Sequence, residues 1–210
     1  MNKRSLLICS SNQGKIAEIR EALADLPFDV KGLEDVGLPA NFDVDEVGRT
    51  FESNALIKAM TLGTHLAYHQ DKFEDMLCLA DDSGLEVDAM GGRPGVHSAR
   101  YGHSNPHRRT KLLEEMRHVP YELRGAQFHC AIALNDPRIF KVRHCEGISR
   151  GMILQKARGE SEFGFDPLFF DETLEKTYAQ MTPEEKFSVS HRGKALRLAR
   201  EILLTDFTSR

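Results

Sequence analysis

The sequence lacks two features of exported or membrane-bound proteins. No hydrophobic stretch approaches the ~20 residues that a transmembrane helix needs. The apolar run at residues 6–9 is also much shorter than the ~7–15 residues of a signal-peptide h-region. We therefore expect a cytoplasmic protein without a membrane partner.

Further absences limit the classes of function. The net charge is −4, so the chain lacks the basic excess of nucleic-acid-binding proteins, although a local basic cluster remains compatible with that charge. We expect no nucleic-acid partner. No HExxH motif is present, and no zinc site is expected. The cysteines show no CxxC spacing, and Cys9, Cys78 and Cys130 lie in apolar runs, which favours small buried residues over metal ligands or disulfides.

No internal repeat, low-complexity segment or linker divides the chain. Its 210 residues, of which 40% are hydrophobic and 29% charged, are enough to bury a large core. We predict a single domain over residues 1–210, built of two lobes.

The first half of the chain alternates between short apolar runs and segments of helical spacing. Over residues 51–68, apolar side chains recur on one helical face. Asn105 and Pro106 are placed as the N-cap and first residue of another helix. Strands are expected at 6–9, 28–33 and 77–80, and helices from about residues 14, 51 and 105.

The second half changes to the periodicity of strands. From residue 124 to 134, apolar side chains alternate with other residues, as in a strand with one buried face. The sequence NDPR at 135–138 predicts a turn, and residues 139–149 are expected to return as an antiparallel strand.

Two helices are expected near the C-terminus. Thr182, Pro183 and Glu185 form a capping box that begins one of them, and the last begins near His191. Strand–helix units, a hairpin and returning helices predict an α/β fold with a mixed sheet. Its cleft is expected where strand ends and helix starts meet, between the two lobes.

Several short stretches carry candidate chemistry. SSNQGK, residues 10–15, lies between a strand and a helix, where backbone N–H groups and one lysine can bind a phosphate; the alternative is a plain turn, and the Walker A pattern is absent. In DEVGRTFESNALIKA, Asn54 and Lys58 lie one turn apart beside the apolar stripe, facing either a cleft or solvent.

The sharpest signal is ADDSG, in which Asp81 and Asp82 close an apolar run ahead of a Ser-Gly turn. Because strand side chains alternate between faces, the two carboxylates are expected to do different jobs. One caps the turn, while the other holds Mg²⁺ or a water; the alternative is two solvated turn residues.

Two later stretches supply aromatic and basic groups. EFGFDP predicts a loop that stacks a base, or aromatic core packing. EEKFSVSHRGKA places Lys186, His191 and Arg192 around a helix start, where they bind phosphate and base oxygens or form a charged helix terminus. Together the stretches indicate an enzyme that acts on a nucleoside triphosphate.

All of these stretches, in this order, resemble the Ham1/RdgB family, the inosine/xanthosine triphosphate pyrophosphatases, from Ser10 to about Lys194. ADDSGLEVDAMGGRPGVHSARY and EEKFSVSHRGKA are highly specific, whereas SSNQGK and EFGFDP are looser. The resemblance implies an elongated mixed β-sheet flanked by helices, with two lobes around a central active-site cleft, and a homodimer. It also implies Mg²⁺-dependent conversion of dITP, ITP and XTP to the monophosphate and pyrophosphate, which cleanses the nucleotide pool.

The resemblance implies that Asp82 is the general base and a metal ligand. The second acidic metal contact falls on Asp45 or Glu46, and the pattern does not decide between them. Lys58 and Lys186 are implied to lie along the triphosphate. The remaining implied substrate contacts are the loop residues Ser10, Ser11, Asn12, Gln13, Gly14 and Lys15, the turn residue Ser83, the base-holding residues Phe163, Gly164, Phe165 and Asp166, and the edge-reading pair His191 and Arg192.

The chain departs from the family pattern in three stretches, the loop at residues 10–12, the helix motif around Ser53 and the stretch at 162–166. Ser11 replaces a glycine, Ser53 replaces a glutamate, and Glu162 and Phe165 replace a glycine and a tyrosine. We expect these changes to affect base selectivity rather than the reaction.

Two alternative functions remain. A Maf-like pyrophosphatase would act on methylated nucleotides and little on dITP. A non-catalytic nucleotide sensor would bind metal through Asp82 and release no pyrophosphate.

Overall fold

The computed structural model describes residues 3–39, 42, 44–69, 75–161 and 163–208. Its strands are β1 (Arg4–Cys9), β2 (Phe28–Gly32), β3 (Met76–Val87), β4 (Gly125–Asp136), β5 (Lys141–Ile153), β6 (Phe169–Asp171) and β7 (Lys176–Thr177). Its α-helices are α1 (Gln13–Leu23), α2 (Phe51–Tyr68), α3 (Asn105–Glu115), α4 (Pro183–Val189) and α5 (His191–Asp206). Short 3₁₀ helices lie at Glu34–Val36, Asp88–Met90, Gly95–Arg100, Tyr121–Leu123 and Tyr178–Gln180.

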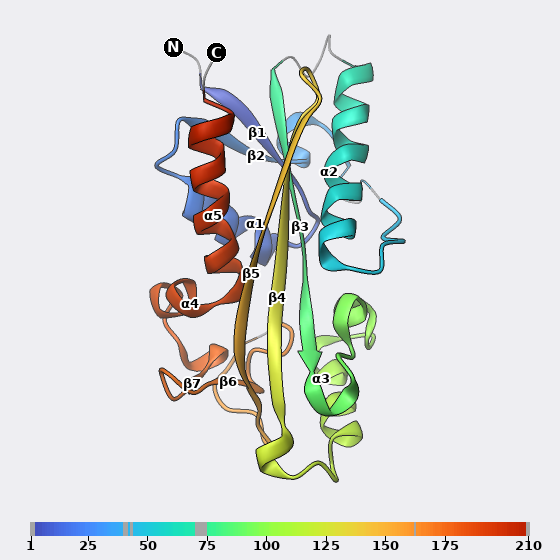
Figure 1. Cartoon of the computed structure of the whole chain (residues 1–210), viewed down its shortest axis with the longest axis vertical. Helices are drawn as coiled ribbons and strands as arrows, with labels where there is room; N and C mark the ends of the chain where they lie inside the picture. Colours follow the sequence, from blue (N-terminus) through green and yellow to red (C-terminus); the bar gives the residue numbers. More distant parts are fainter. Residues whose placement is uncertain (1–2, 40–41, 43, 70–74, 162, 209–210) are drawn as a thin grey trace. The chain divides into compact units, whose positions relative to one another are not determined.

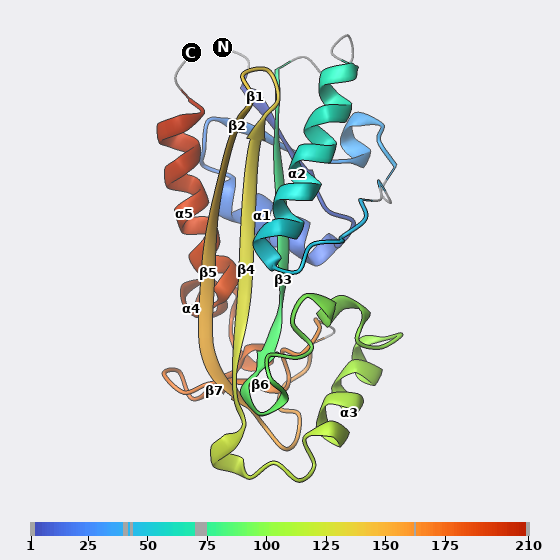
Figure 2. The same cartoon turned by 45° about the vertical axis from the view of Figure 1, so that its right-hand side comes forward.

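Within the described residues the seven strands form one mixed sheet, in the order β2-β1-β3-β4-β5-β6-β7 (Figure 1). β1 is parallel to both β2 and β3, whereas β6 is antiparallel to β5 and β7. The predicted fold class, a mixed sheet flanked by helices, is confirmed. Figure 2 shows β4 and β5 side by side, joined by the turn at residues 137–140.

The strand order reverses at β1, because β2 lies on one side of β1 and β3 on the other. Open α/β sheets bind ligands at the carboxyl ends of strands at such a switch point. Cys9, the last residue of β1, is in register with Ala80 of β3. The loop that begins at Ser10 therefore starts next to Asp81.

The chain divides into two compact units. Unit 1 comprises Met1–Asp82, Ala131–Glu146 and Ala195–Arg210, and unit 2 comprises Ser83–Cys130 and Gly147–Lys194. The single domain over residues 1–210 stays a prediction.

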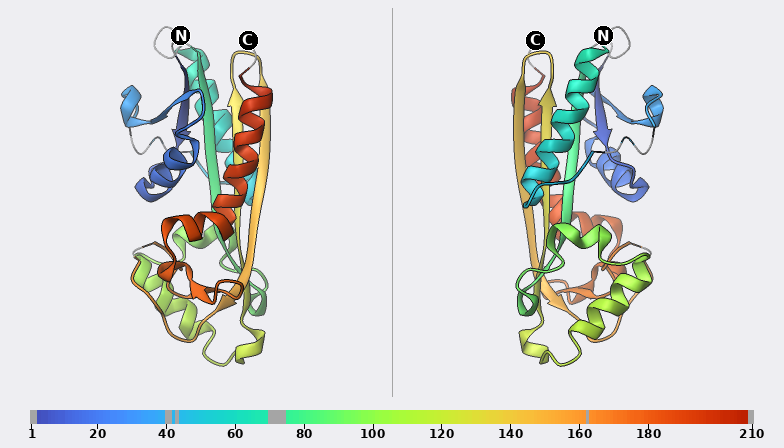
Figure 3. Two further views of the ribbon diagram at one scale, coloured as in Figure 1. Left: turned by 90° about the vertical axis from the view of Figure 1, so that its left-hand side faces the viewer. Right: turned by 90° about the vertical axis from the view of Figure 1, so that its right-hand side faces the viewer.

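Unit 1 is layered. α2 lies on one face of its strands and α5 on the other (Figure 3). Arg200 on α5 contacts the end of α1 through the carbonyl of Ala22 and, at 2.6 Å, the carboxylate of Asp25. Leu7 of β1 is fully buried, as expected for a parallel strand covered on both faces.

Unit 2 has its own apolar core. Leu85 and Val87 from β3 pack there with Leu112 of α3 and with the aromatic rings of Phe128 and Phe169. The two phenylalanine rings meet edge to face with their centroids 4.7 Å apart. This core anchors the segments that carry the aromatic and basic residues described below.

The sequence predicted most elements with small boundary errors. The helix over residues 51–68 and the hairpin of β4 and β5 are confirmed. The predicted turn at 135–138 lies later, because Asn135 and Asp136 still belong to β4. The N-cap of α3 is Ser104 rather than Asn105, since the Ser104 hydroxyl accepts a hydrogen bond from the amide of His107 at 3.3 Å.

The capping box of α4 is confirmed. The Thr182 hydroxyl accepts from the amide of Glu185 at 3.2 Å, and the Glu185 carboxylate accepts from the amide of Thr182 at 3.0 Å. The predicted cysteine burial is confirmed as well, and burial raises the pKa of the Cys9 thiol to about 11. No helix among the described residues combines the length and apolarity that a membrane span requires.

The prediction that a strand ends at the two aspartates is wrong. β3 continues through Asp81, Asp82, Ser83 and Gly84 to Val87, so the expected Ser-Gly turn is extended strand. Neither aspartate therefore caps a turn.

Candidate active site

The adjacent aspartates of β3 are 1% and 6% exposed. Successive side chains of a strand point to opposite faces, and the two carboxylates accordingly have different partners. Asp81 Oδ2 lies 2.9 Å from Lys15 Nζ of α1. Asp82 Oδ2 accepts a hydrogen bond from Asn54 Nδ2 of α2 at 2.9 Å, and Asp82 Oδ1 lies 3.7 Å from Lys58 Nζ. The negative charge of each carboxylate is thus compensated by a lysine from a different helix.

The loop after β1 presents Lys15 from the first turn of α1. Asn12 is the N-cap of this helix, and its side-chain oxygen accepts the amide of Lys15 at 3.1 Å. The Ser10 hydroxyl accepts the amide of Asn12 at 3.2 Å. A helix N-terminus with its partial positive charge and a lysine is suited to a phosphate group.

The ammonium of Lys58 lies close to the acidic side chains of Glu46 and Asp82. Its ammonium lies 2.9 Å from Glu46 Oε1 and donates to the carbonyl of Asp81 at 2.6 Å. Burial lowers the pKa of Lys58, but Asp82, Asp81 and Glu46 together raise it above its ordinary value. For Asp82 burial dominates, and its pKa is raised although Lys58 and Asn54 oppose the shift.

Asn54 is fully buried and connects the acidic loop to Asp82. Its amide nitrogen donates to Asp82, and its oxygen accepts the backbone amide of Gly48 at 2.8 Å. A Cβ at Gly48 would lie 2.5 Å from that oxygen, so only glycine allows the contact. From the sequence, Asn54 is expected on the same helical face as Lys58, but no role is assigned to it there. The i, i+4 spacing of the two residues was the signal that could have indicated a shared site.

Ser53, one of the departures from the family pattern, caps α2. Its hydroxyl accepts the amide of Thr50 at 3.1 Å, and the Thr50 hydroxyl accepts the amide of Ser53 at 3.1 Å. The reciprocal pair forms a capping box, a motif that satisfies two otherwise unpaired amides.

The acidic residues of unit 1 fit a magnesium site with few protein ligands. No three His, Cys, Asp or Glu side chains cluster as a metal cage in the described ranges. Glu46 and Asp82 nonetheless both face the ammonium of Lys58, which is a position of positive charge. Magnesium usually takes one or two carboxylates, with water and phosphate oxygens completing the shell. Asp45 is exposed, so the geometry favours Glu46 over Asp45.

In unit 2 the half-buried ring of Phe163 is flanked by cations. Lys186 Nζ lies 4.8 Å and the Arg192 guanidinium carbon 5.6 Å from the ring centroid. Lys186, expected along the triphosphate, forms an ion pair with Asp166 at 2.8 Å. Arg192 donates to the Ser83 hydroxyl at 3.0 Å. Aromatic, acidic and basic groups therefore converge around one ring.

Two residues expected to contact the base are more deeply buried than Phe163. The Phe165 ring is 3% exposed and belongs to the core, 6.3 Å from the Tyr101 ring. The His191 ring is buried in a stack, 4.6 Å from Phe128 and 6.2 Å from Tyr178. Phe163 is thus the more accessible ring of the base loop, which we define as residues 163–166. Glu162, the other departure in this stretch, lies outside the described residues.

A model of the Ham1 family matches residues 6–202. The chain belongs to the Ham1 family. A dITP/XTP pyrophosphatase of Geobacter sulfurreducens is 43% identical over 201 residues, which is 94% of this chain and 96% of the relative. That of Clostridium perfringens is 39% identical over 203 residues, or 95% and 97% of the two chains. The predicted resemblance is confirmed.

Solved structures of Ham1 proteins share the fold. The Ham1 protein of Staphylococcus aureus has a TM-score of 0.81 at 36% identity, covering 96% of this chain and 98% of its own. A HAM1 protein of Coxiella burnetii has a TM-score of 0.79 at 35% identity, with 96% and 98% covered.

The residues that carry the Ham1 resemblance fall into two groups along the chain. The acidic and lysine group in unit 1 contains Lys15, Glu46, Asn54, Lys58, Asp81 and Asp82. The aromatic and basic group in unit 2 contains Ser83, Phe163, Asp166, Lys186 and Arg192.

Proposed function

We propose that this member of the Ham1 family hydrolyses dITP, ITP and XTP to the nucleoside monophosphate and pyrophosphate. The relatives named dITP/XTP pyrophosphatase, at 39% and 43% identity over nearly the whole chain, support this reaction. The observation that carries the proposal is the buried carboxylate of Asp82, which Asn54 holds at 2.9 Å beside the ammonium of Lys58.

The acidic and lysine group is assigned to the triphosphate. Lys15, Lys58 and the amides at the start of α1 supply positive charge for phosphate oxygens. Ser10, Ser11, Asn12, Gln13 and Gly14 complete this phosphate loop. Glu46 and Asp82 are the residues that would hold magnesium. Magnesium, when bound, supplies charge neutralisation for the triphosphate and for the departing pyrophosphate.

Asp82 is assigned as the general base. In the metal-free protein burial raises the pKa of Asp82, and a more basic carboxylate accepts a proton more readily. Asp82 accepts the proton of the water that attacks the α-phosphorus, and the bond from that phosphorus to the bridging oxygen breaks. Asn54 donates to Oδ2, which fixes the orientation of the carboxylate while Oδ1 faces Lys58.

The aromatic and basic group is assigned to the base. The ring of Phe163 stacks on the purine, and Arg192 donates to its 6-oxo group. Adenine presents an amino group there and is mismatched. Guanine shares the 6-oxo group, so its 2-amino group must be left unpaired, at a cost of about 1–3 kcal/mol. Lys186, itself paired with Asp166, contacts the ring of Phe163, and the Ser83 hydroxyl accepts from Arg192.

The test is product analysis with purified protein, Mg²⁺ and dITP, XTP, GTP or ATP. Pyrophosphate and monophosphate from dITP and XTP, with GTP and ATP largely spared, are expected. Orthophosphate would place the attack at a terminal phosphate and refute the mechanism. Cleavage confined to methylated nucleotides, or tight binding without cleavage, would favour the Maf-like enzyme or the sensor.

The homodimer and the cytoplasmic location also stay predictions. Sedimentation velocity over a range of protein concentrations tests the homodimer, and a titration that compares Mg²⁺ with Ca²⁺ tests the metal.

A further inference from the structure

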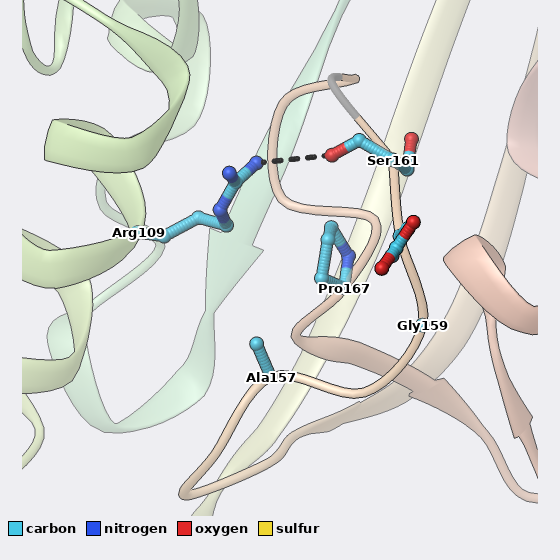
Figure 4. A pocket seen from close by; sticks show the side chains of 6 residues that line it. Arg109, Ala157, Gly159, Ser161 and Pro167 are labelled. Atoms are coloured by element: carbon cyan, nitrogen blue, oxygen red, sulfur yellow. Dashed lines mark hydrogen bonds between the residues drawn. The ribbon is translucent and has the colours of Figure 1, made fainter.

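A cavity of about 490 Å³ lies beside the base loop in unit 2 (Figure 4). It is lined by Arg109, Ala157, Gly159, Glu160, Ser161 and Pro167. Arg109 comes from α3, whereas the other lining residues come from the segment that leads into and follows the base loop. A cavity offers no packed atoms, so the loop lacks dispersion contacts on this side.

The guanidinium of Arg109 crosses this gap to backbone oxygens. Its Nη1 donates to the carbonyl of Ser161 at 3.4 Å and to the carbonyl of Gly164 at 3.0 Å. These two carbonyls lie on either side of Phe163 in the sequence. Gly164 has φ of 43°, a conformation that favours glycine, and Phe163 donates its amide to the Ser161 hydroxyl at 3.0 Å. The backbone around Phe163 is therefore held at both ends.

We propose that Arg109 is a positioning residue for the nucleobase, which fixes the backbone around Phe163 before substrate arrives. The inference rests on the proposed function, in which Phe163 stacks on the purine. Lys186 and Arg192 contact the Phe163 ring, and Arg109 secures the backbone of the same residue. A loop that is ordered in advance loses less conformational entropy when the ligand binds, which tightens binding.

The expected effect follows from the type of bond. Loss of a hydrogen bond from a charged donor typically changes an equilibrium constant by about tenfold or more. Because Arg109 has no place at the reacting phosphorus, its loss should raise KM for dITP by up to about tenfold, the factor by which the loop equilibrium shifts, and leave kcat within about twofold.

Arg108 provides a matched control on the same helix. It is half-buried like Arg109, but it donates to the carbonyl of Gly102 at 3.1 Å and to Asn105 Oδ1 at 2.8 Å, near the start of α3. The variants to compare are Arg109→Gln, Arg109→Lys and Arg108→Gln. Lysine keeps a charged donor for the carbonyls, so Arg109→Lys should recover part of the affinity. Arg108→Gln should leave KM unchanged.

A second readout does not depend on activity. Lys156 and Arg158 are exposed trypsin sites close to the cavity. Without nucleotide, trypsin should cut at these sites about tenfold faster in Arg109→Gln than in the wild type or Arg108→Gln, because the loss of about 1.4 kcal/mol raises the open population tenfold. Mass spectrometry identifies the cut.

The outcomes separate the two proposals. A wild-type protein that leaves dITP intact overturns the proposed function, and with it the role of Arg109. An active wild type with KM and cleavage rate unchanged in Arg109→Gln overturns the positioning role alone. Equal KM increases in Arg109→Gln and Arg108→Gln would do the same, since they would indicate a general effect on α3. If Arg109→Gln does not fold, Arg109→Lys is compared with the wild type instead. Faster cleavage of Arg109→Lys by trypsin together with a wild-type KM would then overturn the inference.

Discussion

Replacing Asp82 by asparagine separates the chemistry of this carboxylate from its contribution to folding. The change keeps the shape of the side chain and an oxygen that can accept from Asn54 Nδ2, now at 2.9 Å from Asp82 Oδ2. It removes the negative charge that lies 3.7 Å from the ammonium of Lys58. Lys58 keeps its contacts with Glu46 and with the carbonyl of Asp81.

Two opposing contributions set the expected change in the free energy of unfolding for Asp82→Asn. At an effective dielectric constant of about 20, an ion pair at this separation is worth about 4 kcal/mol, while burying a charge costs several kcal/mol. The raised pKa of Asp82 indicates that burial prevails. The ionised carboxylate therefore opposes folding once the pH exceeds its ordinary value of 3.8. Because Lys58 keeps its ion pair with Glu46 when the charge of Asp82 is removed, we expect Asp82→Asn to be at least as stable as the wild type at pH 7.

The sign of the pH dependence is part of the prediction. Below pH 3.8 the wild-type carboxyl is protonated in both states and resembles the amide. As the pH rises through the raised pKa, the wild type loses stability relative to Asp82→Asn. Urea unfolding at pH 4 and pH 7 measures this difference.

Activity should fall much further than stability. Loss of a positioned base usually costs about 10²–10⁴ in rate, and the same residue is proposed to hold the metal. Pyrophosphate release from dITP should therefore fall by at least about 10³. Asp88→Asn is the matched control, because Asp88 is exposed and pairs with Arg150 at 2.6 Å. Retention of more than about a tenth of the rate in Asp82→Asn, or a stability loss above about 3 kcal/mol, would refute the reasoning.

Three further changes test the fold that supports the site. Arg124 is 2% exposed and donates to backbone carbonyls alone among its described partners; Arg124→Met removes this buried donor from the carbonyls of Met116, Ile153 and Leu154 and should cost about 3 kcal/mol in urea unfolding, whereas an unchanged midpoint would contradict the assignment. Burial raises the pKa of Asp136, but hydrogen bonds from Arg4 and Arg138 outweigh it and lower the pKa, so its stabilising effect is present above pH 3.8 and is lost at lower pH. Asp136→Asn should therefore be less stable than the wild type at pH 7, with a difference that shrinks below pH 3.8, and a constant difference would argue against this role. A Cβ at Gly193 would lie 1.8 Å from a backbone oxygen of the preceding helix, so Gly193→Ala should lower stability by about 1–3 kcal/mol and reduce activity, and calorimetry with wild-type values would exclude the clash.

The sequence predicted those parts of the fold that depend on local patterns. The alternation over residues 124–134 predicts a strand, although β4 is buried on both faces from Cys130 onward rather than on one, and the apolar stripe over 51–68 predicts one helix. The strand at 77–80 was misjudged at its end, because two charges in a row resemble a turn. Their partners, Lys15 and Lys58, are distant in sequence, so no local rule shows that the charges can be buried.

The residues of the candidate site could be predicted where the type of the side chain indicates its chemistry. Asp82 and Lys58 lie in motifs that resemble a family, and the structure places them together. Asn54 and Arg109 were not assigned roles. Asn54 acts through a carboxylate and a backbone amide, and Arg109 through backbone carbonyls, so neither has a side-chain signature in the sequence.

The continuation of β3 through two aspartates has a physical consequence for the site. A strand that ended at Ala80 would leave both carboxylates in a solvated turn, where their pKa values and positions would vary with the loop. Because β3 continues to Val87, the backbone ladder fixes where each carboxylate starts and which face it points to. Burial then raises the pKa of Asp82, and the lysines of α1 and α2 make the two charges tolerable. Local rules of sequence are broken most often where a protein keeps a group for its chemistry rather than for its stability, and this is consistent with the role proposed for Asp82.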